Sequence, residues 1–268
     1  MARTKSKGIE DKFVDLMDIN YEDSITLWGR PGTGKTTIAG TAPKPLLLVD
    51  VMDKGVKSAR SSSQERGEVT TVLIETFEEL YDVYDYIKEN PGKFKSVVID
   101  HLTSVQGLAH DKVMRDNGKN RMSQQLYGFS GGIQKEVIDL FLSLADEGIQ
   151  PIFLAQDRTR WGDDEGTGEQ LDPEVGPNLQ PLVAKHLMAK SRIVGHTFIN
   201  EEVNPKTLEK TFEYCVRLGP HPYYQTKVTG PKESVVPQYI TNPTIQDILD
   251  VANNQTKPVR KTRKRRRK

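Results

Sequence analysis

The chain has 268 residues, of which 35% are hydrophobic and 28% are charged, so it is long enough for one large α/β domain or two small ones. No apolar run reaches the roughly 18–20 residues that a membrane span needs, and no apolar stretch follows the basic N-terminus, so we expect neither a membrane partner nor a secretory signal. The single cysteine, Cys215, excludes an internal disulfide and is typical of a reducing compartment, which predicts a cytoplasmic location.

The net charge of +1 conceals an uneven distribution of charge along the chain. Residues 257–268 hold nine Lys and Arg and no acid, whereas the remaining residues have a net charge of −8. We expect 253–268 to be a disordered basic tail, since such runs are usually solvated. Cations placed on phosphates release counterions, which favours nucleic acid as its partner over the acidic body of the chain, although a nuclear-import signal would look the same. The predicted DNA contacts in the tail are Arg263, Lys264, Arg265, Arg266 and Arg267.

Strands and helices are predicted to alternate in the first half of the chain. Residues 1–23 form a polar lead-in, with one short amphipathic helix near Phe13–Met17. Several apolar runs are typical of strands that are covered on both faces of a parallel sheet, and amphipathic periodicity indicates helices between them. The strands are expected at 24–28, 45–50, 69–74 and 95–100, and the helices at 36–41, 77–88 and 102–116.

The second half begins with a helix at 132–146, set apart by the Gly/Ser-rich residues 129–132, and a buried strand at 151–156. Residues 157–180 combine many charges with Gly and Pro and are predicted to form a long loop, a kind of segment that is usually functional or disordered. The last expected elements are a helix at 181–191, β segments at 193–200, 210–218 and 223–228, and a terminal helix capped by Asn242 with Pro243 at its first position.

This order of elements predicts an α/β fold over residues 24–252. Strands that alternate with helices indicate a mainly parallel central sheet flanked by helices. The later β segments, joined by short turns, indicate an antiparallel extension at one edge of that sheet.

Residues 29–36 match the phosphate-binding pattern G-x-x-x-x-G-K-[ST], between a predicted strand and a predicted helix. Its glycines let backbone N–H groups turn inward around phosphate oxygens without Cβ clashes. Lys35 is placed to reach the β- and γ-phosphates, and the hydroxyl of Thr36 to ligate Mg²⁺. We therefore predict Mg²⁺-ATP as the ligand. Its predicted contacts are Gly29, Arg30, Pro31, Gly32, Thr33, Gly34, Lys35, Thr36 and Thr37.

Acidic residues that follow two apolar strands are candidates for metal binding and catalysis. Asp100 ends the strand KSVVID, where P-loop proteins carry the acid that orients Mg²⁺; the alternative is an ordinary helix cap. His101 follows it, where many helicase-type ATPases have glutamate, so the water-activating acid is sought elsewhere. Asp50 and Asp53, after the strand LLLVD, are the candidates for that role, and solvated loop acids are the alternative.

Gln156 ends the strand PIFLAQ, which is predicted to lie beside the phosphate-loop strand. A polar side chain there is placed to sense the γ-phosphate and to pass the signal to the loop that follows. The alternative is a strand-end residue exposed to water.

Taken together, GRPGTGKTT, LLLVD, KSVVID and PIFLAQ resemble the RecA-like recombinase core in their order. The likeness is closer to the short phage nucleotide-binding proteins of that class, which act as single-strand DNA annealing proteins. It covers roughly residues 24–230, and further segments carry it. These are SQQLYGFSGGIQKEVIDLFLSLADEGIQPIFLAQ, GPNLQPLVAKHLMAKSRIVGHTF and RLGPHPYYQTKVTGP.

The resemblance implies a RecA-like P-loop NTPase fold with ATP and Mg²⁺ bound by Lys35, Thr36 and Asp100, and Gln156 as the γ-phosphate sensor. In such a family Lys227 points at the ATP of a neighbouring subunit, which implies a homo-oligomeric ring or filament with ATP at its interfaces. A phage protein would act in the host-cell cytoplasm. The family tends to have glutamate where this chain reads DVMDKG, and a second basic residue where Val228 follows Lys227.

The same resemblance places loop 157–180 where the family binds DNA. Arg158 and Arg160 suit contacts to phosphates, and Trp161 suits stacking on the bases of single-stranded DNA. The first hypothesis is therefore a DNA-dependent ATPase of recombination or strand annealing. A nucleotide-gated DNA-binding module with little hydrolysis and a small-molecule P-loop kinase are the alternatives.

Overall fold

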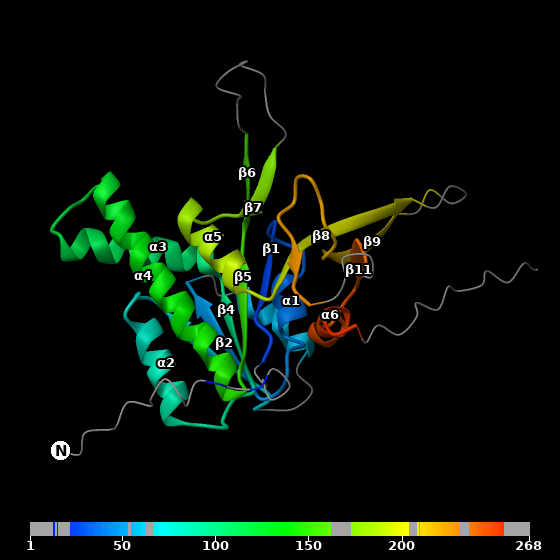
Figure 1. The fold of residues 1–268 in the computed structure, drawn as a ribbon, viewed down its shortest axis with the longest axis horizontal. Helices are drawn as coiled ribbons and strands as arrows, with labels where there is room; N and C mark the ends of the chain where they lie inside the picture. Colours follow the sequence, from blue (N-terminus) through cyan, green and yellow to red (C-terminus); the bar gives the residue numbers. More distant parts are fainter. Residues whose placement is uncertain are drawn as a thin grey trace, which may run out of the picture.

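A nine-stranded sheet crosses the molecule in the computed structural model, which describes residues 13, 15, 22–52, 55–62, 67–161, 173–203, 208, 210–230 and 236–254 (Figure 1). Along the sheet the strands follow the order β11-β9-β8-β1-β5-β4-β2-β3, and β10 also pairs with β8. The bounds of these strands are β1 Ile25–Gly29, β2 Leu46–Val51, β3 Val69–Ile74, β4 Ser96–Asp100, β5 Gln150–Ala155, β8 Ile193–Val203, β9 Lys210–Arg217, β10 Lys227–Val228 and β11 Tyr239–Thr241.

The strands from β8 to β3 in this order are all parallel to their neighbours, as the continuous apolar runs predict. Strand β5 lies between β1 and β4, so the phosphate-loop strand is not a direct neighbour of the strand that ends at Asp100. The predicted neighbourhood of PIFLAQ and the phosphate-loop strand is confirmed, because Leu27 and Leu154 are in register.

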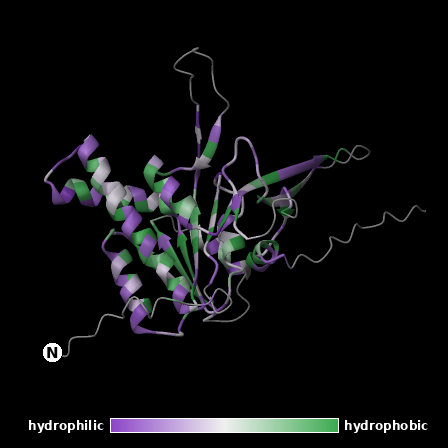
Figure 2. Ribbon diagram, viewed as in Figure 1, coloured by the Kyte–Doolittle hydropathy of each residue, from purple (hydrophilic) through white to green (hydrophobic). Residues whose placement is uncertain are grey.

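Helices cover both faces of the sheet. The sheet therefore separates two hydrophobic cores, one on each face. On one face, Phe141 and Phe153 are buried under α2, α3, α4 and α5. On the other face, Leu27 and Ile38 pack with Ile248 under α1 and α6. Figure 2 shows the hydrophobic residues along the central strands and many hydrophilic residues on the outer faces of the helices. The helices are α1 Lys35–Ala39, α2 Glu79–Glu89, α3 Leu102–Asp116, α4 Gln124–Ser143, α5 Pro181–Lys190, α6 Ile245–Ala252, and the 3-10 helices η3 Gly55–Ser62 and η4 Leu144–Glu147.

An antiparallel extension closes the sheet at the β8 side, as predicted. Strands β8 and β9 form a long hairpin, and β11 pairs antiparallel with β9. Strand β10 pairs with Val194 and Ile193, near the start of β8. The fold is thus a mixed α/β fold with a mainly parallel central sheet, consistent with a P-loop NTPase.

Residues 129–132 lie inside helix α4 and do not separate two helices, which corrects the predicted break. A Cβ atom added to Gly131 would lie 2.8 Å from the side-chain oxygen of Gln180 and 3.6 Å from Val183, on the neighbouring segment of α5. Glycine in a helix interior costs about 1 kcal/mol relative to alanine. Here the missing side chain allows close packing against Gln180 and α5, so tertiary contact outweighs local propensity.

The predicted loop 157–180 is also corrected, because its two ends pair as an antiparallel ribbon. Strand β6 covers Asp157–Arg160 and strand β7 covers Glu174–Pro177, with Arg158 opposite Gly176. Residues 162–172 lie outside the described part of the chain.

The terminal helix α6 is capped by Thr244 and not by Asn242. The hydroxyl of Thr244 accepts from the backbone N–H of Asp247, and the carboxylate of Asp247 accepts from the backbone N–H of Thr244. This is a capping box, which satisfies two unpaired N–H groups at once. Asn242 instead has a positive φ of 46°, a conformation that asparagine tolerates.

Residues 14, 16 and 17 of the predicted helix at 13–17 and the basic tail residues from 255 onward lie outside the described residues. None of the helices in the described part of the chain combines the length and apolar character that crossing a bilayer requires.

Candidate functional site

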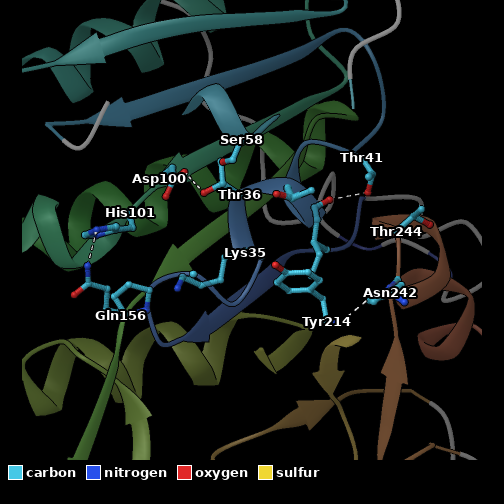
Figure 3. A pocket seen from close by; sticks show the side chains of 16 residues that line it. Lys35, Thr36, Thr41, Ser58, Asp100, His101, Gln156, Tyr214, Asn242 and Thr244 are labelled. Carbon is cyan, nitrogen blue, oxygen red and sulfur yellow. Dashed lines mark hydrogen bonds between the residues drawn. The ribbon is translucent and has the colours of Figure 1, made fainter. Parts of the chain in front are cut away.

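A cavity of about 710 Å³ opens where β1, β4 and β5 end (Figure 3). The carboxyl ends of parallel strands are the position at which open α/β sheets bind ligands. The residues that line the cavity are Pro31, Gly32, Gly34, Lys35, Thr36, Thr37, Ile38, Thr41, Ser58, Asp100, His101, Gln156, Tyr214, Asn242, Pro243 and Thr244. The predicted phosphate loop and the predicted strand-end residues therefore meet in one place.

The loop between β1 and α1 is held in shape by short hydrogen bonds. Gly34 has a φ of +83°, which a side chain would strain. The hydroxyl of Thr33 donates to the carbonyl of Arg30 at 2.7 Å and lies 2.7 Å from the hydroxyl of Thr197 on β8. The loop is thus anchored to a second strand before any ligand binds.

Lys35 is buried, and its ammonium group bridges the loop. It donates to the carbonyl oxygens of Gly29 at 2.7 Å and Arg30 at 2.8 Å. Phosphate oxygens of a nucleotide are stronger acceptors than these carbonyls, because they carry charge. The lysine is therefore positioned to hold a triphosphate within the loop.

Thr36 and Asp100 supply a hydroxyl and a carboxylate at the same point of the cavity. The hydroxyl of Thr36 donates to Oδ2 of Asp100 at 2.6 Å. Oxygen donors of this kind are the ligands of Mg²⁺, which usually takes one or two carboxylates together with substrate phosphates. No group of three or more His, Cys, Asp or Glu suitable for a metal occurs among the described residues. The site thus fits a metal ion that is bound together with a nucleotide. The described residues do not supply a full set of ligands for a metal ion alone.

His101 and Gln156 form a pair next to Asp100. The Nδ1 atom of His101 accepts from the backbone N–H of Ser104 at 3.1 Å, so a neutral ring carries its proton on Nε2. The side-chain nitrogen of Gln156 is placed 3.1 Å from that Nε2 atom, where two donors would face each other. The hydrogen-bond network therefore assigns the amide oxygen of Gln156 to face the ring and accept its proton. The backbone N–H of Gln156 donates to the hydroxyl of Thr103 at 3.1 Å.

Asp50, one of the two acids sought for water activation, does not line the cavity. Asp50 is 3% exposed and lies in register with Asp100 on the neighbouring strand β2, with β4 and β5 between it and β1. Asp53 lies outside the described residues. Asp100 is thus the only carboxylate among the described lining residues.

Lys227 lies beside the first residues of β8, three positions before the residue of that strand that contacts the phosphate loop. It sits on β10 opposite Val194, whereas Thr197 on the same strand contacts the loop. Its ammonium donates to the carbonyls of Met188 and Ala189, at 2.8 and 2.9 Å, near the end of α5. Burial lowers the pKa of this lysine. Lys227 does not line the cavity.

The β6–β7 ribbon begins directly after Gln156 and carries the predicted DNA contacts. Arg158 and Arg160, on the same face of β6, line a second hollow of about 370 Å³ together with Lys185 of α5. Trp161 is 63% exposed at the end of β6. The phosphate-loop residue Arg30 pairs with Asp157, the first residue of β6, at 3.7 Å. The predicted tail contacts, Arg263 to Arg267, lie outside the described residues.

Sequence reasoning missed the side of the cavity formed by Tyr214, Asn242 and Thr244. Tyr214 lies on β9, and the other two residues stand between β11 and α6. No local pattern marks them, because they reach the phosphate loop only through the pairing of β8, β9 and β11. Ser58 lies on η3, which follows β2, and no local pattern marks it either.

Behind the phosphate-loop strand, His196 is packed in a stack of aromatic rings. Its ring centroid lies 4.3 Å from that of Tyr224 and 4.4 Å from that of Trp28. Burial, reinforced by the charge of Arg217, lowers the pKa of His196 from 6.5 to about 3. This histidine is therefore neutral at physiological pH and supports the strand without adding charge near the site.

Comparison with known proteins identifies the family. The family model described as AAA domain matches residues 22–229, and no curated protein matches the chain. The match begins just before β1 and includes the phosphate loop, Asp100 and Gln156. The chain therefore belongs to the AAA domain family, with the core of a P-loop ATPase.

Proposed function

We propose that this protein hydrolyses Mg²⁺-ATP, binds single-stranded DNA and acts in recombination or strand annealing. One observation carries the proposal: the nucleotide cavity and the basic ribbon adjoin each other at the carboxyl end of β5. Gln156 lines the cavity, and β6 starts at the next residue, Asp157. The resemblance to phage annealing proteins supports the same assignment.

The ribbon has the chemistry that single-stranded nucleic acid requires. Arg158, Arg160 and Lys185 offer three cations around one hollow, against one acid, Glu174. The exposed ring of Trp161 offers a stacking surface for a base. The tail residues Arg263 to Arg267 would add contacts to phosphates that do not depend on the sequence of the DNA.

Nucleotide binding would reach the ribbon through two short connections. Arg30, in the phosphate loop, pairs with Asp157 at 3.7 Å. The carbonyl of Gln156 accepts from the backbone N–H of Asn178, just beyond β7, at 2.7 Å. A γ-phosphate that draws the Gln156 amide away from His101 would therefore pull on both ends of the ribbon.

A homo-oligomer with ATP at its interfaces follows from the resemblance, and the position of Lys227 is compatible with it. This lysine does not line its own cavity, as expected of a residue that serves a neighbouring subunit. In the proposed assembly its ammonium would leave the carbonyls of α5 for phosphate oxygens of the neighbour.

A nucleotide-gated module that hydrolyses little ATP is the second candidate, and His101 favours it. This neutral imidazole stands where many ATPases have glutamate, and Asp100 is the only carboxylate among the described lining residues. In the first candidate Asp50, Asp53 or Gln156 would orient the attacking water. In the second, ATP binding alone would switch the affinity for DNA.

Phosphate release from Mg²⁺-ATP, measured with and without single-stranded DNA, tests the proposal and separates the two candidates. Lys35→Ala provides the blank. Release that rises with DNA supports the ATPase, whereas tight ATP binding without release supports the gated module. Unchanged DNA affinity with and without ATP, together with no effect of DNA on hydrolysis, would refute both.

A further inference from the structure

The nucleotide cavity has two chemically different ends, and only the end at the phosphate loop and Asp100 is suited to bind phosphates. Asp100, His101 and Gln156 gather on one side of Lys35 and Thr36, whereas Tyr214, Asn242 and Thr244 stand on the other (Figure 3). A triphosphate held by the loop with its terminal phosphate toward Asp100 must send its nucleoside toward Tyr214. We propose that Tyr214 and Asn242 form the subsite for a purine base, a role that rests on the proposed binding of ATP.

Tyr214 offers a ring surface that is open to the cavity. Its side chain lines the cavity and is 44% exposed, although most aromatic rings of this size prefer burial. The ring also packs directly on the phosphate loop, because a Cβ atom added to Gly34 would lie 3.1 Å from its Cδ1 atom. A base that stacks on this ring would therefore lie within reach of phosphates in the loop.

Asn242 holds Tyr214 in place and keeps one polar group for a ligand. Its backbone N–H donates to the carbonyl of Tyr214 at 2.6 Å, and its side-chain oxygen accepts from the backbone N–H of Tyr214 at 3.1 Å. The side-chain NH₂ group has no hydrogen-bond partner among the described residues. A purine presents ring nitrogens that can accept from such a donor.

The threonine hydroxyl groups at this end of the cavity already have hydrogen-bond partners. Thr41 donates to the carbonyl of Ile38 at 2.6 Å and accepts from the backbone N–H of Ile245 at 2.8 Å. Thr244 donates to the carboxylate of Asp247 at 2.7 Å. The bonds of Thr41 join the residues after α1 to the start of α6, and neither threonine has a donor left for a ligand, unlike the amide of Asn242.

The donor set favours adenine over guanine. On the Watson–Crick edge adenine has an acceptor at N1, whereas guanine has an N–H donor there, which would face the NH₂ donor of Asn242. Among the described lining residues at this end there is no carboxylate to accept that donor of guanine. Residues 242–244 lie after the segment matched by the family model, so this wall is a feature of this chain beyond the matched domain.

Calorimetric titration of the full chain with Mg²⁺-ATP and with inorganic tripolyphosphate tests the subsite. Tyr214→Ala is expected to lower the affinity for ATP by roughly 10-fold, the effect of losing one base–aromatic stack, and to leave the affinity for tripolyphosphate unchanged. Tyr214→Phe should bind ATP like the wild type. Phe212→Ala is the matched control, since Phe212 lies on the same face of β9, is 60% exposed and does not line the cavity.

Asn242→Asp provides a second, independent test. The aspartate keeps the acceptor for Tyr214 and replaces the free donor by an acceptor, so the ratio of ATP to GTP affinity should fall. Equal losses of ATP and tripolyphosphate affinity in Tyr214→Ala would overturn the subsite, because the ring would then only support the loop. An unchanged ATP affinity would overturn it as well. If wild type and Lys35→Ala both fail to bind tripolyphosphate and ATP, the proposed function itself has failed.

Discussion

The hydroxyl of Thr36 donates a 2.6 Å hydrogen bond to Oδ2 of Asp100, although 64 positions separate the two residues in the chain. Thr36 lies on α1, which follows β1, and Asp100 ends β4; the two strands are not neighbours, because β5 lies between them. The bond thus joins the phosphate loop to the opposite wall of the cavity. The same two oxygen atoms are the protein ligands that a nucleotide-bound Mg²⁺ would use.

Asp100→Asn is predicted to lower phosphate release from ATP by roughly 100-fold, since one stabilising charge near the transferred phosphate is lost. Thr36→Ala should require more Mg²⁺ for half-maximal activity, whereas Thr36→Ser, which keeps the hydroxyl, should not. Activity measured over a series of Mg²⁺ concentrations checks both. A Thr36→Ala variant with the wild-type Mg²⁺ dependence would contradict the metal role.

Gln156→Ala is expected to remove the effect of nucleotide on DNA affinity. In the wild type we expect Mg²⁺-ATP to change the affinity for single-stranded DNA by roughly 5–150-fold, the usual range of coupling between two sites. In the variant this ratio should approach one, because the Gln156 amide no longer links the cavity to the ribbon. Fluorescence anisotropy of a labelled oligonucleotide, with and without ATP, measures the ratio. If the variant showed the same ratio of DNA affinities with and without ATP as the wild type, Gln156 would not be the sensor.

The joint variant Arg158→Ala/Arg160→Ala and deletion of residues 257–268 are each predicted to weaken DNA binding. Each phosphate contact that is lost should reduce the slope of log affinity against log salt by about 0.7. Lys93→Ala is the control, because Lys93 is exposed beside Tyr86 on α2, far along the sheet from the ribbon. An unchanged slope after tail deletion would show that the tail is not on the DNA. Lys35→Ala should retain the binding that the tail provides.

The stability of the fold is predicted to fall as the pH drops below about 6.5. The folded state holds His196 neutral, with a pKa of about 3, whereas the unfolded state has the ordinary value of 6.5. Between these values the unfolded chain binds more protons, so acid favours unfolding. Urea unfolding at pH 7.5 and pH 5 should show a loss of stability that is smaller in His196→Phe. The same loss in that variant would mean that other groups cause it.

Arg192→Ala is expected to lower the free energy of unfolding by about 1–3 kcal/mol, the cost of leaving buried hydrogen-bonding groups unpaired. Its guanidinium pairs with Asp23 and donates to the carbonyls of Thr229 and Ala252, at 3.0 and 3.3 Å. It thus joins the segment before β1 to the residues after β10 and α6. Arg115→Ala, which removes an exposed ion pair with Glu78, should cost less than about 1 kcal/mol. Thermal unfolding of the two variants compares them.

Much of the fold follows from local patterns. The apolar runs at Leu46–Val51 and Gln150–Ala155 are buried on both faces of the sheet, so only a covered parallel strand accommodates them. The predicted break at 129–132 failed because a helix can carry glycines where another segment packs closely, as Gln180 does on Gly131. The order of the strands was not readable from the chain, since periodicity does not record which strands become neighbours.

The sequence by itself determined the phosphate end of the site, because a phosphate loop, its lysine and its hydroxyl are contiguous in the chain and act through backbone geometry. It also identified Asp100 and Gln156, since a polar residue that ends an apolar strand must emerge at the carboxyl edge of a parallel sheet. Only the tertiary structure placed Tyr214 and Asn242 at the other end of the cavity and buried Asp50 in register with Asp100, outside the cavity lining. These positions depend on the pairing of strands that are far apart in the chain. The contacts that stabilise this pairing join distant residues, so a short stretch of sequence does not reveal them.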